Sequence, residues 1–103
     1  MQSFKPYYAV IFTSTLTNNT HGYSEMSQKM EELAKSQKGF LGIDSAREDV
    51  GITVSYWESI EAIKSWKQHT EHLIAQQRGR NQWYSWYHTR ICKVEREYEH
   101  FLT

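Results

Sequence analysis

The chain has 103 residues, and its twelve basic and twelve acidic side chains give a formal net charge of +0. This length is typical of one domain and no Pro/Gly/Ser-rich linker or repeat divides it, so we expect one domain over residues 1–103. The balanced charge argues against a nucleic-acid partner, because such binding depends on phosphate neutralisation by a basic surface. Aromatic residues reach 15%, which indicates that large rings supply much of the buried surface.

The cysteine content and the first residues of the chain indicate the cellular compartment in which we expect the protein. Cys92 is the single cysteine and cannot form an internal disulfide bond. Residues 1–6 lack the apolar run of a signal peptide or a membrane span. We therefore expect a soluble, cytoplasmic protein without a membrane partner.

The first part of the chain reads as a strand followed by a helix. Residues 5–16 are rich in aromatic and β-branched side chains, which favours a strand. Apolar residues then recur at spacings of three and four from Tyr23 to Ala34, and this period predicts a helix. Gly39 is suited to a left-handed cap at the end of that helix.

A hairpin and a second helical region follow. Residues 40–47 and 52–57 have strand patterns, and the turn-like residues 48–51 between them predict an antiparallel hairpin. Ser59 is a suitable cap for the next helix, whose inward face we expect to carry Ile60, Ile63 and the pair Trp66/Lys67.

The last part of the chain is predicted to be a short helix and a long strand. We expect the helical region to bend near His69–Thr70 and a second short helix to end about Gly79. Residues 84–98 predict one strand of about 50 Å, more than twice the usual length.

The order of these elements is β-α-β-β-α-β, which predicts an α+β, ferredoxin-like sandwich with helices on one face of an antiparallel sheet. Both faces of the expected strands are apolar: Ile11 and Val54 alternate with Val10 and Thr53 around them. Helices within the chain cover only one face, so we expect a homodimer in which the other face is buried and the long last strand pairs across the interface.

Three segments of the chain contain distinctive motifs. They are G-F-L-G at residues 39–42, W-E-S with Ala62 and Trp66 at residues 57–66, and a stretch rich in aromatic and basic residues from His72 to Arg96. Together and in this order they resemble the antibiotic biosynthesis monooxygenase family, and the third segment resembles an uncharacterised bacterial branch of it. The resemblance implies a dimeric α/β barrel with a hydrophobic pocket for a small aromatic molecule.

Two kinds of chemistry are implied by the resemblance. Members similar to the quinone-forming enzymes oxidise fused phenols with O₂ and no cofactor, in a pocket of Trp, Tyr, Asn and Arg; Trp66, Tyr84, Tyr87 and Arg90 supply three of these residue types. Members similar to the heme-degrading enzymes carry a His ten residues after the helix Trp, where this chain has Gln76. Heme is therefore disfavoured unless His69 or His72 replaces that ligand.

His72 is the residue we expect to act as a catalytic base, because an imidazole with a pKa near 6.5 exchanges protons at neutral pH. We expect His69, Trp66, Tyr84, Tyr87 and Arg90 to contact the substrate. Plainer roles stay open: a helix cap for one histidine, core packing for Trp66 and an ion pair for Arg90. The spacing of His69 and His72 also suits a metal, but no Cys or carboxylate cluster completes a site.

Three functions are compatible with these observations. The first is a cofactor-independent monooxygenase acting on a small planar aromatic compound, with His72 as the base and an aromatic cavity that excludes water. The second is a heme-binding or heme-degrading protein. The third is a dimeric ligand-binding module without catalysis, for which the cavity is needed and the base is not.

Overall fold

The computed structural model describes residues 4–77 and 83–102. Six elements follow in the predicted order: β1 (Tyr7–Leu16), α1 (Tyr23–Lys35), β2 (Phe40–Arg47), β3 (Gly51–Trp57), α2 (Ile60–Gln77) and β4 (Tyr84–Val94). The four strands form one sheet in the order β2-β3-β1-β4, and all neighbours are antiparallel. The predicted α+β, ferredoxin-like fold is confirmed.

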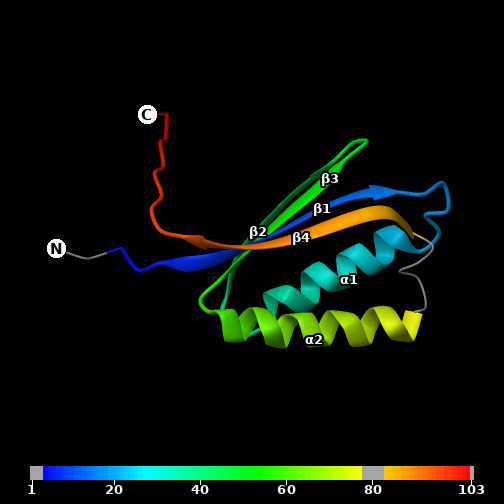
Figure 1. The fold of residues 1–103 in the computed structure, drawn as a ribbon, viewed down its shortest axis with the longest axis horizontal. Coiled ribbons are helices and arrows are strands. Elements are labelled where there is room, and N and C mark those ends of the chain that lie inside the picture. Colours follow the sequence, from blue (N-terminus) through cyan, green and yellow to red (C-terminus); the bar gives the residue numbers. More distant parts are fainter. Residues whose placement is uncertain (1–3, 78–82, 103) are drawn as a thin grey trace.

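Both helices lie on the same side of the sheet (Figure 1). They do not cover it evenly, because α1 packs on β2 and α2 packs on β3, whereas β4 forms the far edge. The side chains of Tyr87 and Ile91 on β4 are consequently 41% and 53% exposed. This uneven cover leaves space under β1 and β4.

The core lies where α2 meets β3. Ala34, Trp57 and Ile63 are its buried members, and Trp57 is 0% exposed. The Trp57 ring meets Phe40 edge-on at 5.5 Å and stacks on Trp66 at 5.7 Å between ring centroids. Its indole N–H donates to the Ser55 hydroxyl at 2.9 Å, so this buried polar group keeps a partner.

Local signals in the sequence account for the helix boundaries near this core. The Ser59 hydroxyl accepts a hydrogen bond from the Ala62 N–H at 3.1 Å, as expected of a helix cap. Gly39 has φ +89°, and a Cβ there would lie 2.8 Å from the Cβ of Ala62. A glycine is therefore required for both the left-handed backbone and the close approach of α2. The predicted Ser59 cap is confirmed. Gly39 has the predicted left-handed backbone, but it does not cap α1, because that helix ends at Lys35 and its C-cap is Ser36 in a right-handed conformation.

The expected bend near His69–Thr70 is wrong, since α2 is a single helix from Ile60 to Gln77. The sequence from residue 60 to residue 77 contains no proline or glycine to interrupt the backbone hydrogen bonds. The predicted helix end at Gly79 lies outside the described residues.

The last strand is shorter than predicted and ends at Val94 rather than Tyr98. Val94 pairs with Tyr7, the first residue of β1, and Pro6 before it has no N–H to continue the ladder. Residues 95–102 continue as a tail that leaves the sheet (Figure 1). The Tyr7 hydroxyl donates a hydrogen bond to the Glu97 carboxylate, which ties the start of this tail to β1.

Within the described residues, neither helix combines the length and the apolar composition that crossing a lipid bilayer requires.

Candidate functional site

A cavity of about 500 Å³ lies between the helices and the sheet. Ligand sites for small molecules usually have volumes of roughly 300–1,000 Å³, so this one is large enough for a planar aromatic molecule. Its floor comes from all four strands of the sheet, and its roof comes from α1 and α2. The central lining residues are Val10, Phe12, Tyr23, Met26, Met30, Ser55, Ile63, Trp66, Trp83, Tyr84 and Tyr87.

Aromatic rings form one wall of the cavity. Phe12 stacks on Tyr87 and meets Tyr84 edge-on, both with 5.5 Å between ring centroids. Tyr84 also meets Tyr23 of α1 edge-on at 5.9 Å. These contacts hold the rings in fixed orientations, so the wall presents preformed aromatic faces and edges to a ligand.

Two tryptophans complete the aromatic lining from opposite directions. Trp66 projects from α2 and is held by stacking on buried Trp57. Trp83 is 5% exposed, and its indole N–H donates to the His21 carbonyl at 2.8 Å. Trp83 also meets Tyr23 edge-on at 5.9 Å between ring centroids, so it belongs to the same set of packed rings as the aromatic wall.

The structure brings together three of the predicted site residues: Trp66, Tyr84 and Tyr87 all line the cavity. His69 and His72 are exposed and are not among its lining residues. Successive residues of a helix turn by about 100°, so His72, nine residues after inward-facing Ile63, lies about half a turn away from it. The expected lining position of His72 depended on the bend that α2 does not have.

Arg90 lies on the opposite face of the sheet. It pairs with Ile11, whereas its neighbours Thr89 and Ile91 line the cavity, and successive side chains of a strand alternate between faces. Any contact of Arg90 with the ligand would need a route around the edge of the sheet. The Gln76 side chain, which replaces the expected heme ligand, lies outside the described side chains.

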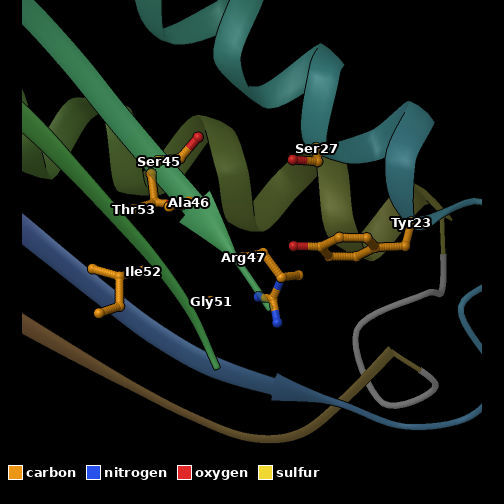
Figure 2. A pocket seen from close by; sticks show the side chains of 8 residues that line it. All are labelled: Tyr23, Ser27, Ser45, Ala46, Arg47, Gly51, Ile52 and Thr53. Atoms are coloured by element: carbon orange, nitrogen blue, oxygen red, sulfur yellow. The ribbon is translucent and has the colours of Figure 1, made fainter. Parts of the chain in front are cut away.

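A second, smaller hollow of about 220 Å³ adjoins the main cavity at the ends of β2 and β3. We call it the annex; Figure 2 shows its residues, which are Tyr23, Ser27, Ser45, Ala46, Arg47, Gly51, Ile52 and Thr53. The annex and the main cavity lie side by side, because four residues line both of them: Tyr23, Ser27, Ser45 and Thr53.

Arg47 is the charged residue among the described residues that line the annex. Its guanidinium reaches across Gly51 to β1, where Nη1 donates to the Ser14 carbonyl at 3.4 Å and Nη2 donates to the Ser14 hydroxyl. Its Cζ lies 5.5 Å from the centre of the Tyr23 ring. A half-buried cation is thus held between the sheet and α1, as seen in Figure 2.

Sequence reasoning did not identify Arg47. An arginine at the end of a strand, next to a polar turn, usually lies in solvent. The predicted hairpin contained a signal for this position, because its short turn places Gly51 directly opposite Arg47. Glycine has no side chain, so the long side chain of Arg47 can cross the neighbouring strand there.

Two tyrosines with perturbed acidity lie on the face away from the cavity. The hydrogen bond to Glu97, with smaller effects of desolvation and of the Glu97 charge, raises the pKa of Tyr7 to about 12. Burial, followed by the charge and hydrogen bond of Asp44, raises the pKa of Tyr56. Both groups stay protonated at neutral pH, so neither serves as a base there.

Within the described part of the chain, no group of three or more His, Cys, Asp and Glu side chains is arranged to hold a metal ion. The charged residues that line the main cavity are Glu31, Lys67 and Glu71 of the helices. Lys67 pairs with Glu71 at 3.9 Å, and Glu31 pairs with Lys35 at 3.5 Å.

The fold and the cavity define a ferredoxin-like α+β protein with an aromatic site between its helices and its sheet. The family model described as "Monooxygenase af470-like" matches residues 9–98. The chain therefore belongs to this family of monooxygenase-like proteins, and its suspected relation to antibiotic biosynthesis monooxygenases is confirmed.

Relatives extend this comparison. The uncharacterized protein YqjZ of Bacillus subtilis (strain 168) is 51% identical over 94 residues, which cover 89% of this chain and 82% of YqjZ. A variant of SnoaB, a cofactor-independent oxygenase from Streptomyces nogalater, has a similar structure with a TM-score of 0.72 at 10% identity, covering 91% of this chain and 97% of that one. A putative antibiotic biosynthesis monooxygenase from Nitrosomonas europaea gives a TM-score of 0.69 at 11% identity, covering 92% and 95%.

Proposed function

We propose that this protein is a cofactor-independent monooxygenase that oxidises a small planar aromatic compound in the main cavity. The observation that carries the proposal is the aromatic wall formed by Phe12, Tyr84 and Tyr87 opposite Trp66, in a cavity of about 500 Å³. Family membership and the fold shared with SnoaB support a monooxygenase-like reaction.

The proposed reaction converts a ring CH₂ group of an anthrone-type substrate into a carbonyl group. The substrate loses a proton and the resulting carbanion-like anion supplies the electrons that reduce O₂. One oxygen atom stays on the ring carbon and the other leaves as water, so no external reductant is required. The protein contributes binding, orientation and removal of water around the anion.

The proton acceptor is proposed to be a carboxylate of the cavity rather than His72. Glu31 and Glu71 line the cavity, whereas His72 is exposed and points about half a turn away from the inward face of α2. A carboxylate can act as the base if it lies within hydrogen-bonding distance of the proton that it removes, either directly or through one water molecule.

Oxygen uptake by metal-free protein with anthrone-type compounds tests the reaction. We expect one O₂ consumed per quinone formed, with Glu71→Gln or Glu31→Gln slowing turnover by roughly 10²-fold or more and His72→Ala leaving it almost unchanged. Binding of the compounds without oxygen uptake would leave a ligand-binding module as the function. Loss of turnover in His72→Ala alone would return the base to that histidine.

We also propose that two copies of the chain pair through the sheet face that carries no helix. Ile52 and Trp86 on this face are 46% and 47% exposed, and the tail beyond β4 carries exposed Tyr98 and Phe101. Apolar surface of this kind favours burial against a partner. Light scattering is expected to give the mass of a dimer at micromolar concentration; a stable folded monomer would refute the proposal.

A further inference from the structure

The annex contains a cation that the proposed reaction does not explain. Arg47 is half-buried, and no carboxylate of the described residues forms a salt bridge with it. Burying a charge without a counter-charge is costly, so such a group is retained where something compensates it. The partial compensation seen here comes from neutral groups: the Ser14 oxygens and the Tyr23 ring.

The guanidinium also has unused donor capacity. It carries five N–H groups in a planar fork, and the two bonds to Ser14 use one on each terminal nitrogen. Its remaining N–H groups make no hydrogen bond to another described residue. These bonds to Ser14 fix the fork in place, and a fixed fork loses little entropy when it binds a planar anion.

The surroundings of the fork suit a small anionic group. Ser27, Ser45 and Thr53 bring hydroxyl groups to the annex, and Ser45 and Thr53 lie on strand positions next to Arg47 and Gly51. The annex, at about 220 Å³, is smaller than a typical ligand site. It is therefore suited to hold a substituent of a ligand whose ring system occupies the adjoining main cavity.

From this geometry we propose that the annex is an anion subsite, in which Arg47 binds a carboxylate carried by the aromatic substrate. The inference rests on the proposed function, since it places the rings of the same ligand in the main cavity. It adds a substrate class, planar aromatic carboxylates, and a residue that determines specificity. Lys67 is the competing cation at the main cavity, but it is exposed and paired with Glu71.

Binding of a matched ligand pair tests the inference. Anthracene-2-carboxylate and the neutral anthracene-2-carboxamide have nearly the same shape, and their own fluorescence anisotropy reports binding; measurement under nitrogen prevents turnover. We expect wild-type protein to prefer the carboxylate by roughly 10-fold or more, since hydrogen bonds to charged groups exceed neutral ones by about this factor.

Three variants separate Arg47 from its neighbours. Arg47→Met is expected to abolish the preference while keeping affinity for the carboxamide, whereas Lys67→Met is expected to leave the preference within about 2-fold because that pair is exposed. Ser14→Ala keeps the cation and removes one of its anchors, so part of the preference should survive. If Arg47→Met does not fold, Arg47→Lys, which keeps the charge without the fork, should reduce the preference instead.

The outcomes distinguish this inference from the proposed function. Equal affinity of wild-type protein for both ligands, or a preference that survives in Arg47→Met or disappears in Lys67→Met, overturns the anion subsite and leaves the aromatic cavity standing. Failure of both ligands to bind overturns the cavity and the subsite together. Preference for the carboxylate that depends on Arg47 alone supports the inference.

Discussion

The substitution Gly51→Ala tests how Arg47 is held. A Cβ at position 51 would lie 2.1 Å from the Arg47 Cζ, 2.2 Å from Nη2 and 2.5 Å from Nε. Ordinary carbon contacts require about 3.5 Å or more, so the guanidinium must move by more than about 1 Å. The backbone need not move, because the clash is with the end of a flexible side chain.

The structure predicts the sign and the size of the effect. Displacement breaks both bonds to Ser14, whose hydroxyl belongs to a residue 0% exposed, and an unsatisfied buried group costs about 1–3 kcal/mol. The lower backbone entropy of alanine in the unfolded chain returns about 0.4–1 kcal/mol. We expect Gly51→Ala to lower the free energy of unfolding by about 1–2 kcal/mol, whereas strand propensity alone predicts a gain.

A double-mutant cycle with Arg47→Ala isolates the contact. Urea unfolding, followed by tryptophan fluorescence at one protein concentration, is measured for the wild type, both single variants and the double variant. In the Arg47→Ala background the Gly51→Ala change is expected to be neutral or slightly stabilising. An equal cost of Gly51→Ala in both backgrounds, or a gain in stability with Arg47 present, would refute the reasoning.

Three further outcomes are expected. Gly39→Ala should destabilise the fold by about 2–4 kcal/mol in thermal or urea unfolding, because the left-handed backbone and the approach of Ala62 both oppose a Cβ; a loss below about 1 kcal/mol would contradict this. The difference in absorbance near 295 nm between wild type and Tyr7→Phe, which reports ionisation of Tyr7, should titrate near pH 12. Because the pKa is raised in the folded protein, the stabilising hydrogen bond to Glu97 is complete below about pH 10 and is lost as the pH rises through 12. A midpoint near pH 10 would contradict this prediction. Trp66→Ala should weaken ligand binding by roughly 3- to 10-fold and Trp66→Phe by less, whereas unchanged affinity in both variants would remove Trp66 from the site.

The sequence alone determined the features that depend on local interactions. The period of three and four residues in α1, the Ser59 cap and the left-handed backbone of Gly39 each act within a few residues of the chain. The same local pattern placed Trp66 on the inward face of α2, and the order of the elements fixed the fold class. These predictions were correct because each rests on backbone geometry that neighbouring residues impose.

Predictions failed where the end of an element depends on its partners. β4 stops at Val94 because β1 offers no residue beyond Tyr7 to pair with, and that limit is set by a strand almost ninety residues earlier in the chain. The placement of His72 failed for a different reason. It assumed a bend in α2 that no proline or glycine in residues 60–77 produces, and such a bend would have altered the direction of every side chain after it.

Only the tertiary structure decided which arginine lies beside the cavity. Arg47 reaches Ser14, thirty-three residues away, because the register of three strands sets Arg47, Gly51 and Ser14 side by side. Arg90, an equally plausible cation in the sequence, faces the other side because strand alternation and the position of the helices assign it there. Sequence supplies the residue types, but register and packing select which of them share one space.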